Sequence, residues 1–181
     1  INKDRKGEIY IVESLENGAG YCNYLSGRIH DNVPEDALIK PLLEGGRIYS
    51  KILLKEKHIE ECSSSCYDCI RDFYNQQYHS VLNWRLGLDV AKLSNDGNTL
   101  VDFNTEYWED YIENTASQLT KRLNGKKIGF ENGTFIIKGV YSSYLITHPF
   151  WSKQFVDELK RKLDYEVSDI TISDALRKIR N

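Results

Sequence analysis

Three of the chain's four cysteines lie within one eight-residue stretch, Cys62-Ser63-Ser64-Ser65-Cys66-Tyr67-Asp68-Cys69. The spacing is CxxxC followed by CxxC. A short loop with this spacing can direct three thiolates at one point about 2.3 Å from each sulfur, as a tetrahedral zinc ion requires. We therefore expect a structural metal site that fixes the loop against the segment Tyr67–Ser94, with a helix beginning directly after Cys69.

The sequence offers two main candidates for the fourth metal ligand. Cys22 would complete a Cys₄ site and use every cysteine in the chain, whereas His58 would complete a Cys₃His site from neighbouring residues alone. His79 is a more remote candidate, and a free Cys22 could instead pack as a small apolar side chain. Disulfides are disfavoured because the cluster is too tight for ordinary bridging. We expect Zn²⁺ rather than iron as the cofactor.

The composition is that of an ordinary globular protein. The 181 residues are 40% apolar and 28% charged, with a net charge of −3, and no run of 18 apolar residues occurs. We therefore expect a cytoplasmic protein without a membrane partner. Because the sequence contains no methionine, we expect a fragment, the C-terminal part of a longer polypeptide.

Hydrophobic periodicity and turn residues predict a mixed α/β (α+β) fold, with a helical segment fixed by zinc between ends that contain strands. The expected helices and strands are a strand at Glu8–Glu13, a helix from Pro34, helical spacing over Tyr67–Leu93, a helix at Thr105–Leu123, a hairpin of Lys127–Phe130 with Thr134–Val140, a strand at Tyr144–His148, and helices at Ser152–Leu163 and Ser173–Ile179.

No stretch of the sequence carries a catalytic motif. There is no GxSxG, no HExxH and no Walker GxxxxGK[ST] pattern, and the acidic residues show no paired arrangement. His30, His79 and His148 have no neighbouring nucleophile motif. His79 follows Asn75 by four residues, and we expect it to form a hydrogen bond within the fold. The sequence does not predict an autonomous enzyme.

A longer pattern surrounds the cysteines: Gly18-Ala19-Gly20-Tyr21, then Cys62-xxx-Cys66-xx-Cys69-Ile70-Arg71-Asp72-Phe73-Tyr74-Asn75-xxx-His79-xx-Leu82-xx-Arg85. It resembles the MrfA-type zinc-binding domain of superfamily 2 helicases and helicase-associated proteins, and is most similar to the DrmB family of DISARM anti-phage systems. Two departures are Glu60, where the family commonly has a further cysteine, and Ser65-Cys66-Tyr67-Asp68-Cys69, where it often has Gly-Cys-Pro-Ser-Cys. The first departure leaves the fourth ligand open between Cys22 and His58.

The resemblance covers roughly Glu8–Leu93 and implies a zinc-binding domain over residues 1–95. Residues 96–181 match it only vaguely, and we expect them to form a C-terminal α+β extension that packs on that domain. It also implies an accessory, non-catalytic role in antiviral defence, with a helicase or ATPase core in the same chain or in a partner subunit. In this role Arg71 and Arg85 are candidate contacts to DNA phosphates, although salt bridges to Asp72 or Asp89 are the alternative. A second hypothesis is a protein-interaction module without nucleic-acid contact, which the net charge of −3 permits.

Overall fold

The computed structural model describes residues 52–95 and 97–180. These ranges contain helices and a mixed four-stranded sheet, so the expected mixed α+β class is confirmed. The helices and strands, in chain order, are α4 (Glu56–Glu61), the 3₁₀ helix η1 (Phe73–Tyr78), α5 (Trp84–Asn95), α6 (Glu106–Arg122), β1 (Lys126–Gly129), the 3₁₀ turn η2 (Glu131–Gly133), β2 (Phe135–Lys138), β3 (Ser143–Thr147), α7 (Lys153–Arg161), β4 (Ser168–Thr171) and α8 (Ile172–Arg180).

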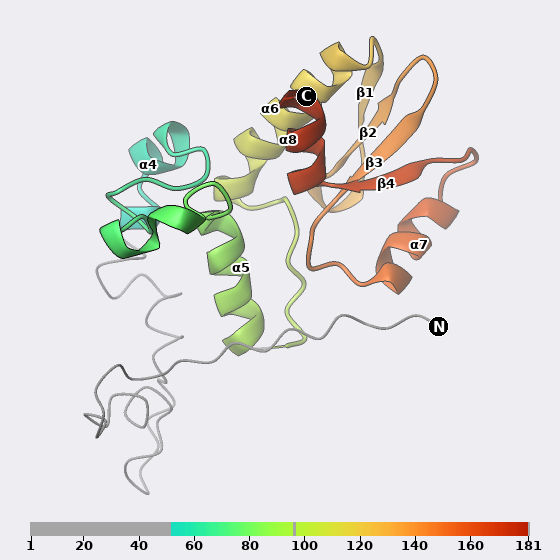
Figure 1. Cartoon of the computed structure of the whole chain (residues 1–181). Coiled ribbons are helices and arrows are strands. Elements are labelled where there is room, and N and C mark those ends of the chain that lie inside the picture. The colour runs from blue at the N-terminus through green and yellow to red at the C-terminus, as the bar shows by residue number, and fades with distance from the viewer. Residues whose placement is uncertain (1–51, 96, 181) are drawn as a thin grey trace, which may run out of the picture.

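The sheet has the strand order β1-β2-β3-β4, so each strand lies beside its neighbour in the chain. The first two pairings are antiparallel. The expected hairpin is confirmed: β1 and β2 are joined through Asn132 and Gly133, which have positive φ angles of 56° and 70°. The third pairing, β3 with β4, is parallel, and α7 is the connection between the two strands (Figure 1).

The two faces of the sheet bury different side chains. Ile137 and Ile146 face α6 and α8, and belong to the larger core, which extends as far as Leu88 of α5. Ile136 and Leu145 are in the smaller cluster with Leu159 of α7. The sheet therefore lies between two helical layers, and α4 and the cysteine loop lie at the opposite end of the molecule from it (Figure 1).

The expected helix over residues 67–83 is wrong. Residues 67–72 are turns and extended chain, and the α-helix begins only at Trp84. Asp72 caps η1 in a reciprocal capping box with Asn75, and Asn83 Oδ1 accepts the N–H groups of Arg85 and Leu86. An Asp or Asn side chain at an N-cap accepts N–H groups of the first helical turn, which in a continuous helix would bond to carbonyls of the preceding turn. Asp72 and Asn83 therefore favour two separate helix starts.

The break also changes which apolar side chains are buried. Phe73, Tyr74, Tyr78 and Val81 are 71%, 89%, 54% and 70% exposed. They therefore form no buried stripe. Trp84 and Leu88, which follow the break, are buried in the core.

The remaining helices agree with the sequence to within two residues. Helix α6 buries Tyr107, Trp108, Ile112 and Leu119, as its periodicity predicts. Thr105 occupies its N-cap without a side-chain cap hydrogen bond. The Ser152 side chain caps α7 by accepting the N–H of Phe155, and the Thr171 hydroxyl accepts the N–H of Asp174 at the start of α8.

The strand expected at Glu8–Glu13 and the helix expected from Pro34 lie outside the described residues. Within residues 52–95 and 97–180, none of the helices combines the length and the apolar character that a membrane span needs.

Candidate metal centre

Four potential metal ligands converge between α4 and η1. The ligand atoms of His58, Cys62, Cys66 and Cys69 all lie within 4.8 Å of one another. The Cys69 sulfur is 3.9 Å from the Cys62 sulfur and 3.5 Å from that of Cys66, and Nε2 of His58 is 3.6 Å from the Cys66 sulfur. The three cysteines are free thiols. These four residues are close enough to hold a metal ion.

The distances fit a tetrahedral ion. With zinc–sulfur bonds of about 2.3 Å and zinc–nitrogen bonds of about 2.0 Å, tetrahedral angles separate two sulfurs by about 3.8 Å and a sulfur from a nitrogen by about 3.5 Å. Three of these separations, Cys62–Cys69, Cys66–Cys69 and His58–Cys66, lie within a few tenths of an ångström of those values, and every other pair lies within 4.8 Å. The site therefore needs no large rearrangement to receive a metal.

Helix α4 presents two of the ligands. His58 lies inside the helix, and Cys62 at its C-cap donates its N–H to the His58 carbonyl at 2.9 Å. The i, i+4 spacing places both side chains on one side of the helix. Nδ1 of His58 lies 3.0 Å from the Leu53 carbonyl. A hydrogen bond from Nδ1–H leaves the lone pair on Nε2, the atom that faces Cys66, and so prepares the ring for metal binding.

The CxxC half forms a tight turn. The N–H of Cys69 donates to the Cys66 carbonyl at 3.2 Å, and the N–H of Arg71 donates to the same carbonyl at 3.0 Å. The Cys66 N–H points at the Cys69 sulfur at 3.0 Å. A backbone donor directed at sulfur stabilises the thiolate form that binds metals.

The protein alone does not favour the ionised form of the Cys62 thiol. Burial, together with hydrogen bonds and charge repulsion from the adjacent Cys66 and Cys69 thiols, raises the pKa of Cys62 to about 12. A bound cation would reverse this effect, because it stabilises the deprotonated thiolates. The crowding of sulfurs is therefore a reason to expect a positive ion between them.

Arg85 binds the backbone of the cysteine loop through its guanidinium. Its guanidinium donates to the carbonyls of Ile59, Cys62 and Ser63 at 2.9–3.1 Å, and its Nε donates to the Tyr107 carbonyl in α6. The side chain is only 2% exposed. Burial lowers the pKa of Arg85 to about 10, so it remains protonated at neutral pH. It connects the metal loop to α6.

The position of Arg85 does not suit the phosphate contact expected from the sequence. Its donors are directed to backbone carbonyls, and its guanidinium carbon lies 4.4 and 4.3 Å from the ring centroids of Trp84 and Tyr111. The alternative of a salt bridge to Asp89 is also wrong, because the acceptors are carbonyls. Arg71, by contrast, is partly exposed, and its Nε donates to Ser65 at 2.9 Å.

The other sequence candidates are placed as follows. His79 bonds to Asn75 at 2.9 Å, which confirms the expected internal hydrogen bond and places it outside the metal cluster. Cys22, the other candidate fourth ligand, and His30 lie outside the described residues.

Sequence reasoning missed a second buried polar centre. The Asp89 carboxylate in α5 accepts hydrogen bonds from Tyr107 at 2.6 Å and from Trp108 at 2.7 Å, and lies 3.0 Å from Nε2 of His148. Asp89 and His148 are 59 residues apart. No spacing in the sequence indicates this pair, because only the tertiary fold brings the two residues together.

No protein-family model, no curated protein and no solved structure matches the chain.

Proposed function

We propose that His58, Cys62, Cys66 and Cys69 hold a structural zinc ion. The observation that supports this most strongly is the convergence of the four ligand atoms to within 4.8 Å of one another, with three of the pairs 3.5–3.9 Å apart. Three thiolates with one imidazole are a common structural zinc set, and four protein ligands leave no open position to activate water. The zinc therefore stabilises the fold and has no catalytic role.

We propose that this zinc-stabilised chain is an accessory, non-catalytic domain of a helicase-associated protein in anti-phage defence. Support comes from the cysteine pattern and its continuation through Arg71, Asn75, His79 and Arg85. The ATPase core lies elsewhere in the same chain or in a partner subunit. The domain contributes DNA contact or subunit docking in the cytoplasm.

A second candidate function is protein interaction without nucleic acid. The exposed aromatic side chains of the segment after the cysteines favour it: Tyr67 is 66%, Phe73 71% and Tyr74 89% exposed. Aromatic side chains are enriched at protein interfaces. Salt dependence distinguishes the two functions, because affinity for DNA falls steeply as salt displaces the protein from phosphates.

The first experiment is metal analysis of the whole chain and of three variants. We expect one zinc per chain in the wild type, loss of zinc in Cys62→Ser, and loss or much weaker retention against a chelator in His58→Ala. His79→Ala is the matched control, because this histidine lies nearby but outside the cluster, and it should retain zinc.

Cys22→Ser decides between the two possible ligand sets. Zinc retained in Cys22→Ser and lost in His58→Ala identifies a Cys₃His site. Zinc lost in Cys22→Ser and retained in His58→Ala identifies a Cys₄ site that includes Cys22. Native protein prepared without chelators that contains no metal would contradict the proposal.

A further inference from the structure

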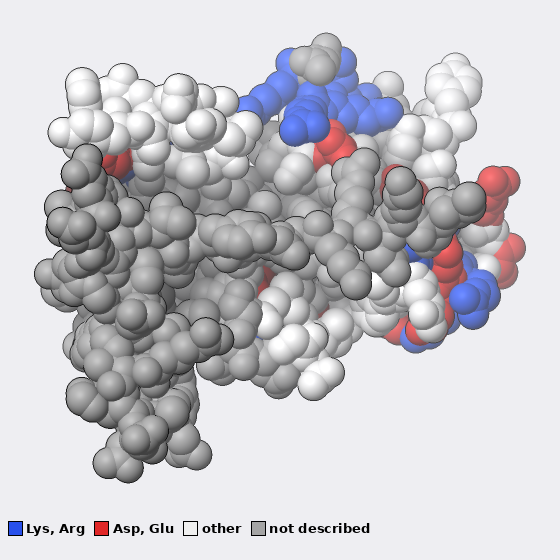
Figure 2. All heavy atoms as spheres, turned by 60° about the horizontal axis from the view of Figure 1, so that its bottom comes forward, with Lys and Arg blue, Asp and Glu red and all other residues white. Residues whose placement is uncertain are grey.

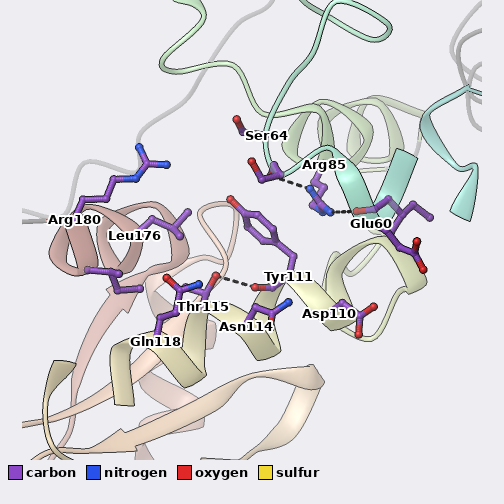
Figure 3. Close-up of a pocket in the computed structure, with 13 residues that line it drawn as sticks. Glu60, Ser64, Arg85, Asp110, Tyr111, Asn114, Thr115, Gln118, Leu176 and Arg180 are labelled. Atoms are coloured by element: carbon purple, nitrogen blue, oxygen red, sulfur yellow. Dashed lines mark hydrogen bonds between the residues drawn. The ribbon is translucent and has the colours of Figure 1, made fainter. Parts of the chain in front are cut away.

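A continuous cleft runs between the cysteine loop and α8. It consists of two adjoining pockets of about 300 and 490 Å³, which share Ser64, Tyr111, Leu176 and Arg180. Figure 3 shows the larger pocket, with the Tyr111 ring between α8 and the loop that carries Ser64. The cleft is therefore bounded by the metal-binding loop on one side and by the last helix on the other.

The smaller pocket is strongly basic. Arg71, Arg177, Arg180 and His79 line it, and its 13 lining residues include no aspartate or glutamate. This is unusual in a chain of net charge −3. Lys and Arg side chains also gather at one edge of the molecule in Figure 2, and the last turn of α8 is basic.

Among residues 52–95 and 97–180, two of these arginines have a single side-chain partner each. Arg71 donates one bond, from Nε to Ser65, and Arg177 is paired with Asp174 in an ion pair whose side chains are 74% and 52% exposed. Each guanidinium has five donor hydrogens, and an exposed ion pair contributes little energy. Donors therefore remain for an anion in the pocket.

The larger pocket differs in chemistry from the smaller one. Successive turns of α6 present Asp110, Asn114 and Gln118 to it, and the three side chains follow one side of the helix in Figure 3. Amides both donate and accept hydrogen bonds, and the carboxylates of Asp110 and of Glu60, which also lines this pocket, accept them. This combination matches the polar edge of a nucleobase, which carries donors and acceptors but no charge.

We propose that this cleft binds a single strand of nucleic acid, with a phosphate against Arg71, Arg177 and Arg180 and a base against Asn114 and Gln118. This inference rests on the DNA-contacting form of the proposed function and assigns its site. A single strand fits this assignment better than a duplex, because the edges of unpaired bases are free to meet the amides of Asn114 and Gln118.

Exposed aromatic residues next to His79, which lines the basic pocket, add a second feature of single-strand sites. Tyr78 is 54% exposed and directly precedes His79, which lines the basic pocket. The His79 ring packs edge-on to Tyr67, with centroids 5.5 Å apart. Proteins that bind single strands combine a basic groove with aromatic rings on which bases stack.

The test is fluorescence anisotropy of the full chain with a fluorescein-labelled dT20 strand at several salt concentrations. Arg177→Glu with Arg180→Glu should weaken binding about tenfold or more, and should reduce the salt slope by about 1.4 if each arginine neutralises one phosphate. The matched control, Lys153→Glu with Arg161→Glu, makes the same charge change on α7 and should alter affinity less than about twofold.

Two further measurements test the preference for a single strand and the contact with a base. A 20-base-pair duplex should bind more weakly than dT20. Asn114→Ala with Gln118→Ala should weaken dT20 binding without changing the salt slope, because amides neutralise no phosphate. Retained zinc and an unchanged circular dichroism spectrum show that each variant is folded.

The outcomes separate this inference from the proposed function. If dT20 binds but the α8 and α7 variants weaken it equally, the cleft assignment is overturned while DNA contact stands. If the wild type binds neither dT20 nor the duplex at low salt, both fail, and the zinc site is judged by metal content alone. Binding of a phosphoserine peptide without any binding of dT20 also overturns the assignment and indicates a protein ligand.

Discussion

Nε2 of His148 lies 3.0 Å from Oδ2 of Asp89, and both side chains are almost completely shielded from water. The backbone N–H of Phe150 donates to Nδ1 of His148 at 3.2 Å, so Nε2 is the nitrogen that donates to the carboxylate. Asp89 belongs to α5, which follows the metal loop and η1, and His148 follows β3. This contact therefore joins the metal-binding end of the chain to the sheet.

Asp89→Asn should lower the free energy of unfolding by about 3 kcal/mol, because the amide turns one acceptor oxygen into a donor that faces existing donors. Urea denaturation measures the change. The control is Asp164→Asn, an exposed position, which should change stability by less than about 0.5 kcal/mol. A similar small effect in Asp89→Asn would contradict the buried network.

Alkaline pH should destabilise the fold through Tyr107. Burial, followed by the charge of Asp89 and the hydrogen bond to it, raises the pKa of the Tyr107 hydroxyl. The folded state therefore keeps the neutral phenol where the unfolded chain, with a tyrosine pKa of about 10, loses the proton. The stability of the fold is therefore unaffected by this group below pH 10. Above pH 10 the free energy of unfolding falls by about 1.4 kcal/mol per pH unit.

Burial also raises the pKa of Tyr111, with the same consequence. Urea midpoints recorded between pH 8 and pH 11 should show the decline. Tyr107→Phe should reduce its slope, and Tyr141→Phe should leave the slope unchanged, because the Tyr141 side chain is 99% exposed. Equal slopes in all three proteins would count against the role of Tyr107.

Arg85→Lys should destabilise the chain although it conserves the charge. The guanidinium serves four backbone carbonyls and lies against two aromatic rings, whereas an ammonium offers three donors from a single point. We expect a loss of about 2–3 kcal/mol in urea denaturation. The exposed Arg122→Lys on α6 is the control, and an equally small effect at both positions would show that Arg85 does not hold the loop.

Gly133→Ala should destabilise the fold much more than Gly129→Ala. Gly133 has a φ of +70°, and a Cβ there would lie 2.7 Å from Oδ1 of Asn104 and from the Phe103 carbonyl carbon, whereas a Cβ at Gly129 would have no atom within 4 Å. We expect the free energy of unfolding to fall by about 2 kcal/mol or more in Gly133→Ala and by less than about 1 kcal/mol in Gly129→Ala. Equal thermal midpoints for the two variants would contradict the turn geometry.

The local parts of the fold could be predicted from the sequence. Helix α6 has a full amphipathic period and an Asn-Gly stop, and the hairpin is specified by Asn132-Gly133, so short-range chemistry is sufficient in both. Strand β4 could not be predicted, because the polar sequence Ser168-Asp-Ile-Thr171 becomes a strand only by pairing with β3. Its residues show no clear alternation of apolar and polar side chains.

The cysteine cluster was predictable, but the geometry around it was not. Spacing indicates that three thiols can converge, and it left the fourth ligand open between Cys22 and His58. Helical spacing of apolar residues after Cys69 was misleading, because spacing does not show whether a core faces those residues. The direction of Arg85 depends on contacts across 22 to 26 positions in the chain, which no local pattern contains.

The sequential order of the sheet also has a consequence for the folding pathway. Each strand pairs with its neighbour in the chain. The two antiparallel pairings close short loops and the parallel pairing of β3 with β4 closes across α7, and contacts of short sequence separation form rapidly. The contact between Asp89 and His148 spans 59 residues and closes a much longer loop at greater entropic cost. We therefore expect the sheet with α6 to fold first, and the metal-binding end to dock on it in a later and slower step.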